Sequence, residues 1–182
     1  LAALRELDAG SHFSPDFAGA RIPTLDEVFE AIGDRLLVNV ELKTTALLGT
    51  TNAALAAAVA TDVARHNLAG RVLLSSFNPF ALRAARRHAP GLPLGYLYAP
   101  DLPLPLAKAW LARPVIGRHE ARHPHFSSVD AGYMAWARRE GYRVNVWTVN
   151  EVEDIRRMVE LGVDMIISDH PDRTGRVLRG EA

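Results

Sequence analysis

Three polar side chains alternate with apolar ones along the segment 36–43, and their types suit the binding of a phosphorylated ligand. Asn39, Glu41 and Lys43 share one face of a strand, because successive side chains of a strand point to opposite faces. Strands buried in parallel sheets are usually apolar on both faces, and burying a lone carboxylate or ammonium is costly. The pattern therefore indicates either a metal ligand beside a phosphate ligand, or a mutual ion pair at an exposed strand end.

A second strand, predicted at 142–148, has the same two-faced pattern. Val144 and Val146 share one face, whereas Asn145 and Trp147 share the other. Trp147 stands close to the C-terminal end of this strand, where an indole either forms the apolar wall of a pocket or packs in the core. The pattern leaves both interpretations open.

His119, His123 and His125 form a cluster that invites comparison with a zinc site. Their spacing does not match the usual zinc-binding motifs, and Pro124 is expected to interrupt any regular element. We expect instead a polar loop between a strand and the next helix, with His123 or His125 at the rim of a pocket.

The ingredients of a serine hydrolase are also present in Ser75, Ser76, Asp169 and His170. No Gly-x-Ser-x-Gly elbow surrounds either serine, so the usual setting of such a nucleophile is missing. The segment 168–171 indicates a strand end followed by a helix that has Pro171 in its first turn. The glycines do not form Gly-x-Gly-x-x-Gly, so nothing supports a dinucleotide-binding fold.

A repeated order of elements must position these residues. Short apolar runs predict strands at 36–42, 72–76, 92–98, 115–118, 142–148 and 163–168. Amphipathic patterns predict helices at 51–67, 79–88, 128–140 and 151–161, and the segment 100–111 is expected to be an irregular crossover. Glycines that precede the apolar runs are expected to end helices in the left-handed conformation: Gly33, Gly70, Gly91, Gly141 and Gly162.

This alternation is typical of parallel βα units. A closed (β/α)8 barrel takes about 250 residues and eight such units, and two missing units would add roughly 60 residues to this chain. Six predicted strands fit such a barrel with two units absent, and they fit an open doubly wound sheet equally well.

The composition is that of an ordinary globular domain, and we treat residues 1–182 as one domain. Lysine plus arginine equals aspartate plus glutamate at 21 each, so the overall charge gives no indication of nucleic-acid binding. There is no cysteine and no transmembrane run of roughly 18 apolar residues. Because the chain starts at Leu1, we expect the natural N-terminus to lie upstream; the compartment stays undetermined, with the cytoplasm slightly favoured.

Several segments, taken in order, resemble the glycerophosphodiester phosphodiesterase family. They are LDAGS at 7–11, FSP at 13–15, IPTLDEV at 22–28, VELK at 40–43, SSF at 75–77, VWTVN at 146–150, GVD at 162–164 and SDHP at 168–171. Each segment alone is weak evidence, whereas the ordered set covers nearly the whole chain.

The resemblance implies a TIM (β/α)8-type barrel that is incomplete here and contains about strands 3–8. It implies that Glu41 is a metal ligand, that Lys43 binds the substrate phosphate, and that Trp147 with Phe77 lines the substrate pocket. The expected cofactor is Ca2+ or Mg2+. The expected substrate is a glycerophosphodiester, or a related lysophospholipid, that is hydrolysed to glycerol 3-phosphate and an alcohol.

The resemblance also places the family's His-Arg-Gly, Glu-x-Asp and His-Asp motifs before Leu1. We therefore expect no catalytic residue in this chain, an active parent protein and an inactive 182-residue piece that does not retain the cation. Two alternatives stay open: a non-catalytic barrel remnant that binds a phosphorylated metabolite through Lys43, and a partial domain without a ligand. An incomplete barrel has two unpaired strand edges, so self-association is expected.

Overall fold

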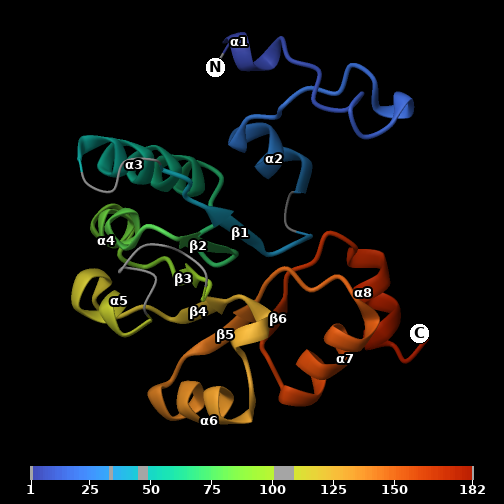
Figure 1. Ribbon diagram of the computed structural model, residues 1–182. Helices are drawn as coiled ribbons and strands as arrows, with labels where there is room; N and C mark the ends of the chain where they lie inside the picture. The colour runs from blue at the N-terminus through green and yellow to red at the C-terminus, as the bar shows by residue number, and fades with distance from the viewer. Residues whose placement is uncertain (1, 33–34, 45–48, 101–108, 182) are drawn as a thin grey trace.

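Six parallel strands, hydrogen-bonded in their sequence order, form one curled sheet with helices on its outer side (Figure 1). The computed structural model describes residues 2–32, 35–44, 49–100 and 109–181, without the side chains of 109–112. The strands are β1 (Val38–Glu41), β2 (Val72–Ser76), β3 (Leu94–Tyr98), β4 (Ala121–Pro124), β5 (Arg143–Val146) and β6 (Met165–Ile166). In a barrel, parallel strands lie next to each other in sequence order, whereas in a doubly wound sheet the strand order reverses. The observed order is therefore that of part of a barrel.

Helices connect successive strands. They are α3 (Thr50–Arg65), α4 (Pro79–His88), α5 (Ala109–Ile116), α6 (Ala131–Glu140), α7 (Val152–Leu161) and, after the last strand, α8 (Pro171–Leu178). The N-terminal region contains α1 (Ala2–Arg5), the 3-10 turn η1 (Pro15–Phe17) and α2 (Leu25–Ile32), and a second 3-10 turn, η3 (Phe126–Ser128), follows β4. Of the predicted crossover 100–111, residues 101–108 lie outside the described part, and its last residues belong to α5.

The N-terminal loop is organised by one carboxylate. Asp8 accepts hydrogen bonds from the backbone N–H groups of Gly10, Ser11 and Gly19 and from the Ser11 hydroxyl. These bonds hold the pKa of Asp8 well below its usual range, the Ser11 hydroxyl being the largest cause. The loop therefore has a defined conformation before the chain enters α2.

The two-faced pattern of β1 is confirmed from Val38 onwards. Val38 and Val40 pack against the main hydrophobic core, and Leu42 is 2% exposed. Leu36 was expected on the same face, but it precedes the strand and is 57% exposed. The described strand is shorter than the predicted one because only residues from Val38 pair with β2.

The strand predicted at 115–118 is wrong, and so is the polar loop predicted around the histidines. Residues up to Ile116 belong to α5, and the strand is β4, at the centre of the sheet and fully buried. The sequence pattern did not predict this strand because Arg122 and His123 are polar. Arg122 faces the helices, with its guanidinium carbon 5.4 Å from the ring centroid of Trp136 and 4.5 Å from that of Tyr142. Stacking on aromatic rings accommodates a cation that the sequence pattern assigned to solvent.

Helix ends agree with the sequence in part. Gly141 and Gly162 end α6 and α7 in the left-handed conformation, as predicted. Past the end of α3 it is Asn67, with a φ of 55°, that adopts this conformation. Gly70 and Gly91 have no positive φ, so the prediction for them is wrong, and Gly33 lies outside the described residues.

Two buried clusters hold the helices to the sheet. One joins α2, α3 and α4 to β1, β2 and β3, and the other joins α6, α7 and α8 to β5 and β6. The sheet ends at β1 on one side and at β6 on the other, so the barrel is incomplete in the described residues, as expected. No helix among those residues is long and apolar enough to cross a bilayer.

Candidate functional site

The predicted site residues all lie at the C-terminal ends of the strands. Glu41 ends β1 and Lys43 follows it, Phe77 follows β2, and Trp147 follows β5. This edge of the sheet is where (β/α)8 barrels place their active sites. We call it the mouth, and the inner face of the curled sheet the lumen.

Glu41 and Lys43 form a weak ion pair. The Lys43 Nζ lies 3.9 Å from a Glu41 carboxylate oxygen, and the two side chains are 81% and 31% exposed, respectively. A pair this exposed contributes about 0–1 kcal/mol to stability, so a ligand can replace either partner at little cost. The ion-pair interpretation is thus seen in the geometry, and the ligand-binding interpretation stays a prediction.

An aromatic wall stands on the other side of the mouth. Trp147 and Phe77 meet edge to face with ring centroids 5.3 Å apart, and Phe77 is 37% exposed. The indole N–H of Trp147 donates to the backbone oxygen of His123 at 2.7 Å, which fixes the plane of the ring. Trp147 is half-buried at this edge rather than enclosed in the core, and its role in lining a substrate pocket stays a prediction.

Beneath this wall, polar residues face the lumen in a layer that the sequence did not reveal. Asn145 Nδ2 donates to His123 Nε2 at 2.9 Å, and the imidazole fills the space where a side chain on Gly95 would stand. A Cβ at Gly95 would lie 2.2 Å from His123 Nε2. His123 is 0% exposed, and burial lowers its pKa to about 4, so the ring is neutral. The available signal was Gly95 itself, because a glycine inside a strand often marks a close approach by another group.

Two further polar atoms in the lumen are buried without a hydrogen-bond partner among the described residues, His123 Nδ1 and Ser75 Oγ. Ser75 is the register partner of both Glu41 and Gly95. Unsatisfied buried groups call for an explanation, and an ordered water is the commonest one. The layer below Glu41 is therefore polar rather than a packed apolar plug.

Asn150 joins the segments 146–150 and 168–171, which were singled out from the sequence. Its Oδ1 accepts from the Ser168 hydroxyl and from the Asp169 backbone N–H, and its Nδ2 donates to the Asp169 carboxylate. The Arg173 guanidinium donates to the Asn150 carbonyl at 2.7 Å. Asn150 thus fixes the end of β6 and the start of α8 against the loop that carries Trp147, a role that sequence reasoning missed.

A serine hydrolase triad is not assembled. Ser76 donates to the Leu42 carbonyl and accepts from the Asn78 backbone N–H, which gives it a structural role. Pro171 occupies the first turn of α8, as predicted, although His170 makes no side-chain capping bond. Asp169 is held by Asn150 on the far side of the mouth.

The zinc interpretation of the three histidines is also excluded within the described part of the chain, where no group of three His, Cys, Asp or Glu side chains is arranged to hold a metal ion. His119 packs between Tyr96 and Tyr142 on the helix side of the sheet, His123 lies in the lumen, and His125 lies at the mouth next to Trp147.

The Ca2+ or Mg2+ that the resemblance implies stays a prediction. Glu41 supplies one carboxylate at the mouth, whereas Ca2+ takes six to eight oxygen ligands and Mg2+ six. The described residues therefore do not form a complete metal site by themselves.

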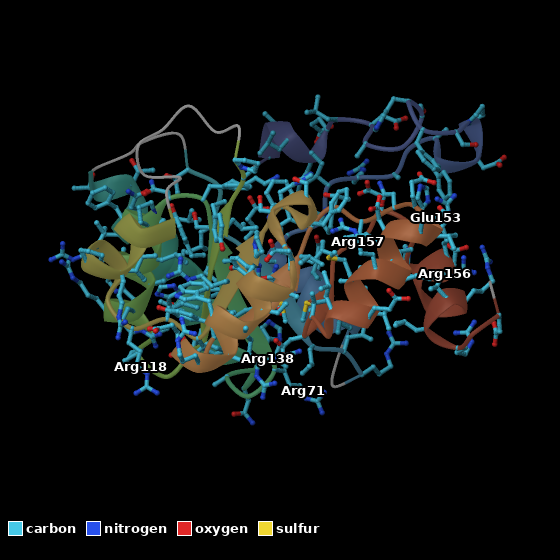
Figure 2. The ribbon with its side chains drawn as sticks, turned by 60° about the horizontal axis from the view of Figure 1, so that its bottom comes forward. Arg71, Arg118, Arg138, Glu153, Arg156 and Arg157 are labelled. Atoms are coloured by element: carbon cyan, nitrogen blue, oxygen red, sulfur yellow. The ribbon has the colours of Figure 1, made fainter. Side chains whose placement is uncertain are left out.

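Arginines gather at the opposite edge of the sheet. In Figure 2 the side chains of Arg71, Arg118 and Arg138 lie along one side of the molecule, where strands begin and helices end. Positive side chains near helix C-termini complement the helix dipole, and Arg138 donates to the carbonyls of Leu161 and Gly162. At the mouth itself, Lys43 is the cation closest to Glu41.

Comparison with known proteins identifies relatives over almost the whole chain. A model of the "Glycerophosphoryl diester phosphodiesterase family" matches residues 1–173. A glycerophosphodiester phosphodiesterase of Caldanaerobacter subterraneus subsp. tengcongensis is 36% identical, with 98% of this chain and 71% of that protein covered. One of Bacillus subtilis is 24% identical, with 99% and 64% covered.

Among solved structures, an Oleispira antarctica phosphodiesterase in complex with the product sn-glycerol-3-phosphate superposes with a TM-score of 0.83. It is 28% identical and the match covers 98% of this chain and 70% of that one. The chain spans between 57% and 71% of the length of such relatives. The missing share agrees with a barrel that lacks its first strands.

Proposed function

The chain belongs to the glycerophosphoryl diester phosphodiesterase family, and from this we propose that its parent protein hydrolyses glycerophosphodiesters to glycerol 3-phosphate and an alcohol. The observation that carries the proposal is the placement of Glu41 and Lys43 at the mouth, with the aromatic wall of Trp147 and Phe77 at the same edge. An ammonium binds a phosphate oxygen, and an apolar wall suits the carbon skeleton of an alcohol. The glycerol 3-phosphate held by the Oleispira relative supports the same ligand here.

The residues of this chain act in binding and orientation. Lys43, which is 81% exposed, is free to reach a phosphate that approaches from solvent. Glu41 would contribute one oxygen to a divalent cation, Ca2+ or Mg2+, whose positive charge offsets that of the phosphate. The backbone carbonyl of His123 holds the indole of Trp147 in place, and the Asn145 side chain holds the His123 ring below it. Proton transfer to the departing alcohol is assigned to residues outside this chain.

It follows that the 182 residues alone should not turn over substrate. One carboxylate does not hold the cation, and burial keeps the lumen residue His123 neutral and out of contact with solvent. A non-catalytic remnant that binds a phosphorylated metabolite through Lys43 is the second candidate. The observation that favours it is that the described residues contain no group of three side chains arranged to hold a metal ion.

Release of glycerol 3-phosphate from glycerophosphocholine tests these proposals. The assay compares the product of the whole gene with the 182-residue chain, each with Ca2+, with Mg2+ and with a chelator. We expect metal-dependent activity of the whole gene product and no activity of the 182-residue chain. In the whole gene product, Lys43→Met should raise KM by about tenfold. Activity of the short chain would refute its proposed inactivity, and an inactive whole protein that still binds glycerol 3-phosphate would favour the remnant.

A further inference from the structure

His125 is a mouth residue to which neither the sequence motifs nor the family resemblance gives a role. It lies one residue beyond β4 and is bridged in register to Trp147 beyond β5. Side chains alternate along β4, so Arg122 faces the helices and His123 faces the lumen. His125, two residues after His123, faces the same side as His123, at the mouth. Its side chain is half-buried, unlike that of His123.

The ring of His125 packs against two other rings. It meets Trp147 at 86° with centroids 5.3 Å apart, and it packs on Phe126 with centroids 4.6 Å apart. Phe126 is in turn covered by Arg157 of α7, labelled in Figure 2, whose guanidinium carbon lies 5.7 Å from the ring centroid. A continuous row of rings therefore runs from Phe126 through His125 and Trp147 to Phe77.

The cap of the 3-10 turn η3 fixes which nitrogen of His125 carries the proton. The ring Nδ1 accepts a hydrogen bond from the backbone N–H of Ser127, with the Ser127 hydroxyl 2.7 Å away. Because a backbone N–H can only donate, Nδ1 is unprotonated in the neutral ring, and the hydrogen is on Nε2. The mouth thus has an aromatic wall with one oriented N–H donor in it.

We propose that His125 is a substrate-binding residue whose Nε2–H donates to a hydroxyl oxygen of the polyol half of the substrate, while the carbon chain of the polyol lies on Trp147. An apolar wall alone would accept an alkyl group equally well, whereas an oriented donor favours a hydroxylated one. The inference rests on the proposed function, because it assumes a phosphate held near Lys43. It adds a preference for polyol phosphates over alkyl phosphates.

Binding measurements by calorimetry test the preference with sn-glycerol 3-phosphate, propyl phosphate and inorganic phosphate. The product of the whole gene, with Ca2+ present, is expected to bind glycerol 3-phosphate about three- to tenfold more tightly than propyl phosphate, which is the value of one net hydrogen bond. His125→Phe keeps a ring on Trp147 but removes the donor, so it should abolish the preference and leave the affinity for propyl phosphate unchanged. His88→Phe, at the exposed C-terminal end of α4, is the matched control.

A second readout does not depend on ligand binding. Long-range proton–nitrogen correlation spectra of the imidazoles should show His125 protonated on Nε2 and unprotonated on Nδ1 near pH 8. The opposite tautomer, or a preference that survives in His125→Phe, would overturn the inference. Equal binding of glycerol 3-phosphate and propyl phosphate would overturn it while leaving the proposed phosphate site intact, and failure of all three ligands to bind would refute both.

Discussion

Phe77 and Trp147 meet edge to face at the mouth, with ring planes at 86°, although they follow strands β2 and β5, which are not neighbours in the sheet. The curl of the sheet brings these two strand ends together. The contact joins the part of the molecule that carries Glu41 and Lys43 to the part that carries His123 and His125, and it defines the width of the mouth.

The Trp147 side chain should stabilise the fold through its N–H as well as its ring. Trp147→Phe keeps the ring contact but leaves the His123 carbonyl without its donor, and we expect a loss of about 1 kcal/mol in the free energy of unfolding. Trp147→Ala also removes both ring contacts and should cost about 2–4 kcal/mol. Urea unfolding followed by circular dichroism measures both, with Phe77→Leu as a control expected to cost less than about 1 kcal/mol. Equal stability of Trp147→Phe and wild type would show that the bond contributes nothing.

Gly95 is required by the imidazole of His123. Gly95→Ala places a Cβ 2.2 Å from His123 Nε2, and we expect a destabilisation of about 1–3 kcal/mol in urea unfolding. Gly91→Ala is the matched control: a Cβ there meets nothing within 4 Å, and the change should stay within about 0.5 kcal/mol.

A double variant separates this clash from a backbone effect. Combining Gly95→Ala with His123→Ala removes the ring that the new methyl group meets, so the two losses should be less than additive. Strict additivity would mean that Gly95 is needed for its backbone freedom instead.

Stability should fall as the pH drops below about 6.5. Burial lowers the pKa of His123 and that of His119 from 6.5 to about 4, with Arg122 near His119 acting in the same direction and Glu120 opposing. Between these values the unfolded chain binds more protons than the folded one, so acid favours unfolding, by on the order of 1 kcal/mol per pH unit for each ring. Above pH 6.5 both states are neutral and this dependence disappears.

Urea midpoints at about pH 7 and about pH 5 measure the effect, because most carboxylates still keep their charge in this window. His123→Gln should remove about half of the pH dependence, since His119 continues to titrate. His88→Gln, an exposed position, should leave the dependence unchanged. A pH-independent wild type would show that the two rings do not stay neutral.

The open edges of the sheet should promote self-association. Residues of β1, β2 and β6 line a hollow of about 400 Å³ at the end opposite the mouth, and Leu37 beside it is 72% exposed. Leu37→Asp is expected to weaken association, whereas Val159→Asp on the outer face of α7, which is 45% exposed, should not. Sedimentation velocity over a range of concentrations measures this. A monodisperse wild-type monomer with cooperative unfolding at high temperature would contradict the prediction.

The sequence by itself determined five of the six strands, in order, and the strand ends at which the site is placed. Alternation along a strand is a local property, so the polar face of Glu41 and Lys43 and the position of Trp147 were predicted from residue order alone. The segment 72–76 and the helix 79–88 agree with the described β2 and α4 residue for residue, because apolar content and Pro79 at the helix start are local signals. Order and motif resemblance together indicated an incomplete barrel.

Only the tertiary structure decided which polar residues are buried. The strand β4 was missed because its Arg122 and His123 look solvent-exposed in sequence, and they are stabilised by Trp136 on one face and by Asn145 on the other. These partners come from different elements and meet only when the strands pair and the helices pack on them. The same long-range packing brings Phe77 onto Trp147 and sets the ring of His125 beside it, since contacts between distant strand ends depend on sheet curvature rather than on local preference.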